Sequence, residues 1–254
     1  MSKDKKTECL RYDARAQSLL AAGNTAFGTE LALGSLVIPP IFRAPYGYYE
    51  QRVRQYICKE DDVLELGAGT GLHTYALMQT GARVVASDIS SHALEVLSQR
   101  IGGGVKTQVA DMESHTFEDS SFDVVTCAGS LSDGEPDLVD AEVRRVLRPG
   151  GIFICVDSLN HNPIYRFNRW FHYLRDVRTK STLLRIPTME RIQSISQGFK
   201  SVEVRYFGAV SYLMPILARI IGENHASNVS DAVDRLVQVR RSAFKFVLVA
   251  RGRL

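Results

Sequence analysis

Seven short apolar segments alternate with helical patterns from residue 61 onward, and this alternation constrains the fold more than any other feature of the chain. The segments cover residues 63–66, 83–87, 105–110, 122–127, 152–156, 201–206 and 243–250. Strands separated by helices build a mostly parallel sheet that carries helices on both faces. The sequence therefore predicts an α/β, doubly wound fold with a seven-stranded, mostly parallel sheet.

The 254 residues are predicted to form a single domain, because this length suits one α/β unit with insertions. Residues 1–58 are expected to be helical, over 10–22 and 46–57, and residues 59–157 form the core. Two segments, 159–187 and 208–239, are insertions that a minimal sheet of alternating strands and helices does not need. They follow late strands, near the edge where open α/β sheets bind ligands, so we expect them to contribute to ligand selection.

The composition is that of an ordinary globular protein, with 45% hydrophobic and 23% charged residues. The N-terminal stretch "MSKDKKTECLRYDARAQ" lacks the apolar core of a signal peptide, and no run approaches the roughly 18 apolar residues of a transmembrane helix. We therefore expect a cytoplasmic protein without a membrane span. The four cysteines form no C-x-x-C pair, so no metal site is predicted.

Three glycines follow the first predicted strand in "VLELGAGTG", residues 63–71. A glycine-rich turn between a strand and a helix lets a ligand approach the main-chain N–H groups. A dinucleotide site has G-x-G-x-x-G spacing, but here Leu72 occupies the place of the third glycine. The spacing disfavours NAD, and the absence of a following Gly-Lys-Ser/Thr excludes a P-loop.

Two acidic residues indicate the kind of nucleotide. Glu65 precedes the turn inside an apolar strand, where a carboxylate would repel a pyrophosphate and attract an ammonium group. Asp88 ends the next strand, where a carboxylate can accept both hydroxyls of a ribose. Together they predict a nucleoside whose tail carries a positive charge.

Four stretches resemble the class I S-adenosylmethionine-dependent methyltransferases, in particular the small-molecule subgroup similar to ubiquinone and menaquinone methyltransferases. They are "VLELGAGTG", "VVASDIS", "VADMESHTFEDSSFDVVTCAGSL" and "VLRPGGIFICVD", within roughly residues 56–157. The resemblance implies a Rossmann-like methyltransferase fold, an antiparallel seventh strand and S-adenosylmethionine as cofactor. It implies cofactor contacts from Tyr12, Glu65, Gly67, Ala68, Gly69, Gly71, Asp88, Ile89, Asp111, Met112 and Ala128.

The expected reaction is methyl transfer to oxygen or nitrogen of a small molecule, with a sugar or an anionic compound as the first expectation. A hydroxyl acceptor profits from a general base. His161 follows the fifth strand and is the leading candidate for that base, although a histidine that only orders this loop fits the same position. Tyr46, Tyr48, Asn160 and Arg166 are the candidate substrate contacts.

The second half of the chain is basic: residues 144–254 carry 19 Lys and Arg against 7 Asp and Glu. The aromatic and arginine-rich segment 160–191 is compatible with a lid over the acceptor or with a helix whose basic face is solvated. The apolar "AVSYLMPILARIIG", 209–222, is compatible with a packed helix or with contact with a membrane or a lipid-linked acceptor. No nucleic-acid-binding module is present, so nucleic acid is not an expected partner.

Two other activities fit part of the pattern. An NAD(P)-dependent oxidoreductase would use the same strand–turn–helix unit, although Leu72 and Glu65 disfavour it. A catalytically silent protein that binds S-adenosylmethionine and supports a partner would share every cofactor motif.

Overall fold

A computed structural model describes residues 3–21, 38–174, 179–237 and 239–254. Seven strands form one sheet with the order β3-β2-β1-β4-β5-β7-β6. Their bounds are β1 Asp62–Leu66, β2 Arg83–Asp88, β3 Lys106–Val109, β4 Phe122–Ala128, β5 Leu147–Ser158, β6 Phe199–Phe207 and β7 Lys245–Arg253. β1 to β5 pair in parallel, whereas β7 lies between β5 and β6 and is antiparallel to both. The predicted fold class and the antiparallel seventh strand are confirmed.

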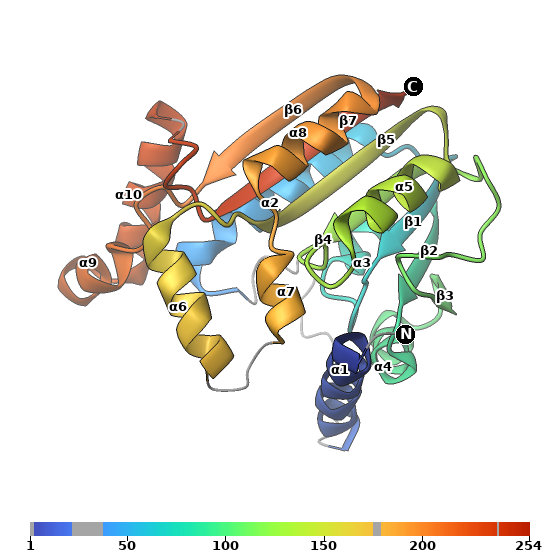
Figure 1. Cartoon of the computed structure of the whole chain (residues 1–254), viewed down its shortest axis with the longest axis horizontal. Helices are drawn as coiled ribbons and strands as arrows, with labels where there is room; N and C mark the ends of the chain where they lie inside the picture. Colours follow the sequence, from blue (N-terminus) through green and yellow to red (C-terminus); the bar gives the residue numbers. More distant parts are fainter. Residues whose placement is uncertain (1–2, 22–37, 175–178, 238) are drawn as a thin grey trace.

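Helices cover both faces of the sheet (Figure 1). They are α1 Lys3–Ala21, α2 Pro40–Tyr56, α3 Thr74–Met78, α4 Ser91–Ile101, α5 Pro136–Val146, α6 Pro163–Leu174, α7 Lys180–Leu184, α8 Met189–Gln197, α9 Met214–Ile221 and α10 Glu223–Leu236. In Figure 1, α5 and α8 lie on the near face and α2 lies behind the sheet. The helices α1, α6 and α7 extend beyond the carboxyl ends of the parallel strands.

The two faces of the sheet are buried in separate cores because side chains alternate along each strand. Leu64, Val125 and Phe153 join the core that includes residues of α5 and α8. Val63 and Val124 join the core that contains Tyr49 and Val53 of α2. Glu65 is two residues beyond Val63, so it shares the face covered by α2. This register directs its carboxylate toward the end of the first parallel strand.

Several boundaries differ from the predicted ones. α1 and α2 begin seven and six residues earlier than the periodicity indicates, at Lys3 and Pro40. Proline in the first turn starts a helix without loss, because its missing N–H has no partner there. β5 begins at Leu147 rather than at Ile152, since the "RPGG" stretch is extended and passes directly into the strand.

The two predicted acceptor-side segments are helical where they are described. α6 and α7 lie in the first, and α9 and α10 lie in the second. Residues 175–178, which belong to the predicted basic segment, lie outside the described residues, as does Ala22 at the end of the predicted first helix. Among the helices of the described ranges, none combines the length and apolar character that crossing a bilayer requires.

Candidate functional site

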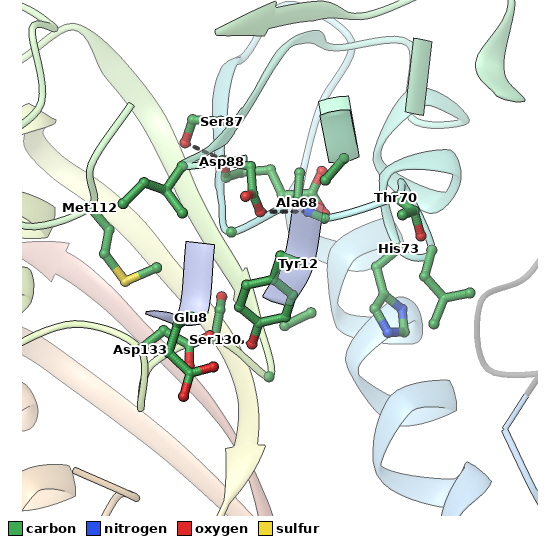
Figure 2. Close-up of a pocket in the computed structure, with 18 of the residues that line it drawn as sticks. Glu8, Tyr12, Ala68, Thr70, His73, Ser87, Asp88, Met112, Ser130 and Asp133 are labelled. Carbon is green, nitrogen blue, oxygen red and sulfur yellow. Dashed lines mark hydrogen bonds between the residues drawn. The ribbon is translucent and has the colours of Figure 1, made fainter. Parts of the chain in front are cut away.

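A cavity of about 360 Å³ lies at the carboxyl ends of β1, β2 and β4, with residues of α1 on its remaining side (Figure 2). Ten of the eleven residues predicted to contact the cofactor line this cavity. The exception is Gly71. The cavity therefore brings together the glycine turn, the end of β2 and the segment after β3, which are far apart in the sequence.

Gly69 presents bare backbone to the cavity. Its φ is +53°, and apart from its chain neighbours no atom of the described residues lies within 4 Å of the place where a Cβ would be. Its N–H donates to Oδ2 of Asp88 at 2.9 Å, which holds the turn against the end of β2. A ligand can therefore lie directly on the main chain at this position.

Gly71 does not line the cavity, so its contact with the cofactor stays a prediction. Gly71 has a φ of +84°, and a Cβ there would lie 2.9 Å from Cγ of Leu97 on α4. A glycine is needed at this position for the positive-φ backbone conformation and for close packing against α4. Residue spacing alone does not separate this packing role from a ligand-binding role.

Glu65 is buried at the end of β1 and accepts a hydrogen bond from Thr74 Oγ1 at 2.6 Å. Burial, with a smaller contribution from the charge of Asp88, raises the pKa of Glu65 to about 7. Among the described residues, none supplies a cation to this carboxylate. A positively charged group of a ligand would complete the site, because it would stabilise the ionised form.

Asp88 is held by the backbone on both sides. Its Oδ2 accepts from Gly69, and its Oδ1 accepts from the N–H of Ser90 at 2.8 Å. Burial raises the pKa of Asp88, while backbone hydrogen bonds from Ser90, Gly69 and Ile89 lower it. A carboxylate has about four lone-pair sites, so at least one remains for a hydroxyl group of a ligand.

Met112 lies at the opposite end of the cavity from His73 (Figure 2). Asp111, which precedes it in the sequence, also lines the cavity. Lys5 of α1 is buried and lies 2.5 Å from Oδ1 of Asp111 and 2.8 Å from Oε2 of Glu113. The sequence did not indicate Lys5 as a site residue. It closes the end of the cavity at which the adenine is expected.

α1 is attached to the cavity and to the helical insertion by further hydrogen bonds. Tyr12 donates from its hydroxyl to Oδ2 of Asp133 at 3.0 Å. Glu8 is buried, and its Oε1 accepts from the hydroxyls of Thr179 and Thr182 at 2.8 and 3.0 Å. Tyr12 therefore lies at the cavity as predicted, while Glu8 connects this helix to α7.

His161 lies outside the cavity lining, so the structure does not support it as the catalytic base. Its Nε2 accepts the backbone N–H of Met189 at 2.9 Å and lies 4.0 Å from Oε2 of Glu190. The nitrogen that a base would use is engaged at the start of α8. The structure favours the loop-ordering role for this histidine.

Of the four predicted substrate contacts, only Tyr46 lines the cavity. Tyr48 faces the opposite side of α2, where its hydroxyl donates to Oε1 of Glu203 at 2.6 Å. Asn160 accepts a long hydrogen bond of 3.4 Å from Arg169, and Arg166 is exposed on α6. Tyr48 faces away from the cavity, and Asn160 and Arg166 lie in the insertion beyond it, so their contact with a substrate stays a prediction.

His73 is the lining residue that the sequence interpretation assigned to packing or solvent. It is buried, and its Nδ1 lies 3.3 Å from Oε1 of the buried Glu50 of α2. Its ring stacks on Tyr46 with centroids 5.0 Å apart. Among the residues that the structure describes, none hydrogen-bonds to Nε2. Glu50 and Tyr46, which contact His73, belong to α2, a separate element that precedes the glycine turn. The only indication in the sequence that His73 reaches the cavity was its closeness to Gly71.

Among the described residues, no group of three or more His, Cys, Asp or Glu is arranged to hold a metal ion. The acidic groups of the cavity are single carboxylates placed along its length, and Lys5, Arg15 and His73 also line it. The carboxylates suit an organic ligand with donors at both ends.

Comparison with known proteins identifies the central part of the chain. Residues 64–155 match the family model described as a methyltransferase domain. These residues form a class I S-adenosylmethionine-dependent methyltransferase domain. The matched segment contains most of β1, all of β2 to β4 and most of β5, and therefore most of the cavity's sheet side.

Two curated relatives are similar to this methyltransferase domain and its flanks. The demethylmenaquinone methyltransferase of Clavibacter sepedonicus is 42% identical over 108 residues, which are 41% of this chain and 44% of that protein. The ubiquinone/menaquinone biosynthesis C-methyltransferase of Desulfotalea psychrophila is 36% identical over 135 residues, or 48% of this chain and 54% of that protein. The chain thus spans about half the length of these relatives.

Solved structures share the fold at low identity. Phosphoethanolamine N-methyltransferase 2 of Haemonchus contortus, in complex with S-adenosylhomocysteine, has a TM-score of 0.58 at 18% identity, over 82% of this chain and 53% of that chain. A (4+2)-cyclase, SpnF, has a TM-score of 0.59 at 18% identity, over 84% and 83% of the two chains. One fold therefore carries different reactions, and the function of this chain has to be argued from its cavity.

Proposed function

We propose that this chain binds S-adenosylmethionine in the cavity and transfers its methyl group to a small-molecule acceptor. The observation that carries the proposal is the buried carboxylate of Glu65, which has no cationic partner among the described residues and lies in the same cavity as the open backbone of Gly69. S-adenosylmethionine carries the ammonium group, ribose and adenine that these positions fit.

Different residues of the cavity contact different parts of S-adenosylmethionine. Glu65 holds the amino group of the methionine part, and Asp88 accepts hydrogen bonds from the ribose hydroxyls. Met112 provides an apolar contact and Asp111 a polar one at the adenine end. A sulfonium methyl group is already electrophilic, so the main tasks of the chain are to align the acceptor and to exclude water. α1 contributes to the exclusion, since Glu8 and Tyr12 lie along the cavity.

His73 is the group in the cavity best placed to take a proton from the acceptor. Glu50 accepts from Nδ1, and this leaves Nε2 as the basic nitrogen of a neutral imidazole. The acceptor atom forms its bond to the methyl carbon while the electrons of the carbon–sulfur bond remain on sulfur. The proton that the acceptor loses passes to Nε2 and then to water. Glu50 acts through His73 and is a positioning residue.

This arrangement suits an acceptor whose reacting atom loses a proton. A hydroxyl oxygen meets that requirement, which keeps oxygen as the first expectation although His161 no longer supports it. A ring carbon activated by a hydroxyl also meets it, and the similarity to a protein named a C-methyltransferase favours this second candidate. The expectation of a sugar-like acceptor now depends on the assay alone, because Arg166 lies outside the cavity.

The test has a binding arm and a turnover arm. Calorimetry with S-adenosylmethionine should show binding that Asp88→Ala weakens by about 1.5–3 kcal/mol, the range for hydrogen bonds to a charged group. Labelled methyl donor is then incubated with panels of hydroxylated aromatic compounds and sugars, and products are followed by mass spectrometry. Binding of NADH with no binding of S-adenosylmethionine would establish the oxidoreductase alternative. Binding without turnover on any panel would favour the catalytically silent alternative.

A further inference from the structure

The helices α6 and α9 lie at one end of the molecule (Figure 1), and both carry exposed apolar side chains. On α6, Phe167 is 66% exposed and Trp170 is 48% exposed. On α9, Ile216 is 63% exposed and Ile220 is 76% exposed. Large apolar side chains that gather on one surface, rather than occurring singly, mark an interaction site. We call the exposed surface formed by these two helices the α6–α9 face.

The apolar residues follow the helical period on each helix. Ile164, Phe167 and Phe171 are spaced by three and four residues along α6. Leu213, Ile216 and Ile220 have the same spacing at α9. Residues with this spacing share one side of a helix, so each helix presents a continuous apolar stripe.

The inward side of α6 is anchored by polar contacts, which fixes the apolar side outward. The hydroxyl of Tyr165 hydrogen-bonds to Ser211, and the Tyr165 ring packs against Phe244 at 5.2 Å. Arg169 donates to the carbonyl oxygen of Leu159 at 2.9 Å. Rotating the helix to bury Phe167 would break these contacts. The exposure is therefore built into the packing of the helix.

The two stripes belong to one surface. An open hollow of about 500 Å³ is lined by Ile164 and Phe167 of α6 together with Tyr212 and Pro215 at the start of α9. Phe42 at the beginning of α2 forms part of its floor. Among the described residues that line the hollow, none is charged, so this lining suits an apolar group such as an acyl chain or an aromatic side chain.

The charge around this surface has one sign over a long stretch. Neither residues 160–174 nor residues 204–222 contain an Asp or Glu, while both contain arginine. Asp176 follows the first stretch, and Glu203 and Glu223 flank the second. Residues 159–254 together carry 16 Lys and Arg against 6 Asp and Glu. Arginine can place its stem on apolar surface while its charge remains in water.

We propose that the α6–α9 face docks onto an anionic lipid bilayer. Short helices with aromatic and branched apolar residues on one side and arginines beside them bind in the interfacial plane of membranes. Anionic lipid headgroups complement the basic surroundings. A symmetric contact with a second copy would bring the same basic surface against itself, and like charges oppose that arrangement. This binding is peripheral and does not require a membrane span.

Trp170 is the single tryptophan of the chain, so tryptophan fluorescence reports on the α6–α9 face alone. The full-length protein is mixed with vesicles of phosphatidylcholine alone or with phosphatidylglycerol added. Binding is followed by co-sedimentation and by Trp170 fluorescence with acrylamide quenching. We expect binding to the anionic vesicles, a blue shift, protection from acrylamide, and weakening of binding as salt is raised. No methyl donor or acceptor is present, so the result is separate from that of the methyl-transfer assay.

Two variants of the face and one matched control sharpen the experiment. Phe167→Ser with Ile220→Ser should weaken anionic-vesicle binding by at least about tenfold, since apolar burial is lost. Arg166→Glu with Arg219→Glu should do the same by reversing the charge. Val109→Ser with Leu138→Ser alters exposed apolar residues on β3 and α5 and should leave binding unchanged.

Four outcomes would overturn the proposal. They are absence of binding to anionic vesicles, equal binding to phosphatidylcholine alone, and equal weakening in the matched control. The fourth is protection of Trp170 from acrylamide without vesicles, which would mean that this face is already covered by another part of the chain or by a second copy. Sedimentation of the vesicle-free protein at several concentrations distinguishes cover by the same chain from cover by a second copy, because only the second depends on concentration.

Discussion

At the scale of single residues, the cavity places one carboxylate and one imidazole where their protonation states bear on function. Glu65 has a raised pKa because it is buried, and His73 is oriented by Glu50. Neither property follows from residue type. Both depend on what surrounds the side chain, and each leads to a measurable prediction.

The affinity for S-adenosylmethionine is expected to rise with pH below neutrality. The pKa of Glu65 in the folded protein is about 7, against an ordinary value of 4.5, so ionisation opposes folding, and stability falls as pH rises between these values. An ammonium group bound at Glu65 favours the ionised carboxylate and therefore has to displace a proton at lower pH. The dissociation constant should fall by up to about tenfold per pH unit between about pH 5.5 and pH 7.

Calorimetry in buffers with different ionisation enthalpies measures both the affinity and the proton released on binding. Glu65→Gln keeps the shape of the side chain and cannot ionise, so its affinity should be weaker at neutral pH and nearly flat across this range. An equally steep pH dependence in Glu65→Gln would assign the proton to another group, for example Asp88.

His73→Ala is expected to reduce turnover with little effect on cofactor affinity. A positioned general base contributes about 10²- to 10⁴-fold, so a loss in that range is expected once an acceptor is known. Glu50→Gln should lower turnover less, because it changes only the partner that orients Nδ1 of His73. Kinetics of kcat and KM with the acceptor separate these effects from lost binding.

His161→Ala is the matched control for His73→Ala. His161 accepts a backbone N–H at the start of α8, so its loss should lower stability slightly and leave kcat nearly unchanged. Retained turnover in His73→Ala together with lost turnover in His161→Ala would return the catalytic role to the residue that the sequence indicated first.

At the scale of elements, the turn between β1 and α3 has two kinds of glycine. Gly69 faces open space in the cavity, whereas Gly71 lies against Leu97 of α4. The same three-glycine motif therefore serves ligand approach and helix packing. Each requirement can be tested by a single methyl group.

Gly71→Ala is expected to destabilise the fold more than Gly102→Ala. Both residues have positive φ, at which alanine costs about 1–2 kcal/mol. A Cβ at Gly102 meets no protein atom, but one at Gly71 lies 2.9 Å from Leu97, which adds about 1–3 kcal/mol of overpacking. Urea unfolding of the two variants measures the difference. Equal destabilisation would show that the Leu97 side chain moves aside without a loss of stability.

At the scale of the whole molecule, a buried ion pair connects helices of one face to the loop that follows β4. Arg191 of α8 donates to Oδ1 of Asp140 on α5 at 3.0 Å and to the carbonyl oxygen of Leu131 at 2.8 Å. Burial raises the pKa of Asp140, while the charge of Arg191 lowers it. The loop that contains Leu131 also carries Ser130 and Asp133 of the cavity. The pair thus connects overall packing to the candidate site.

Arg191→Met is expected to lower the free energy of unfolding by about 3–5 kcal/mol, because it leaves the Asp140 carboxylate buried without its partner. Arg185→Met removes the partly exposed pair with Glu135 and should cost at most about 1 kcal/mol. Chemical denaturation at neutral pH compares them. Similar costs for the two variants would mean that water reaches Asp140 in solution.

The sequence by itself determined the features that local physics encodes. Alternating apolar and helical segments predicted all seven strands, since burial on both faces of a parallel sheet requires continuous apolar runs. The glycine spacing with Glu65 and Asp88 predicted the kind of ligand, and the resemblance to class I methyltransferases implied eleven cofactor contacts, ten of which line the cavity. Apart from Tyr12 of α1, these ten residues lie at or just beyond strand ends, which the fold class places at one edge of the sheet.

Only the tertiary structure decided which side chains reach that edge from the helices. A strand end has one location in a sheet, but a helical residue faces inward or outward according to how the helix is rotated and docked. His73 reaches the cavity because α2 supplies Glu50 and Tyr46 beside it, whereas His161 is engaged by α8 and Tyr48 faces away. The same rotation, fixed by Tyr165 and Arg169, leaves the apolar stripe of α6 exposed.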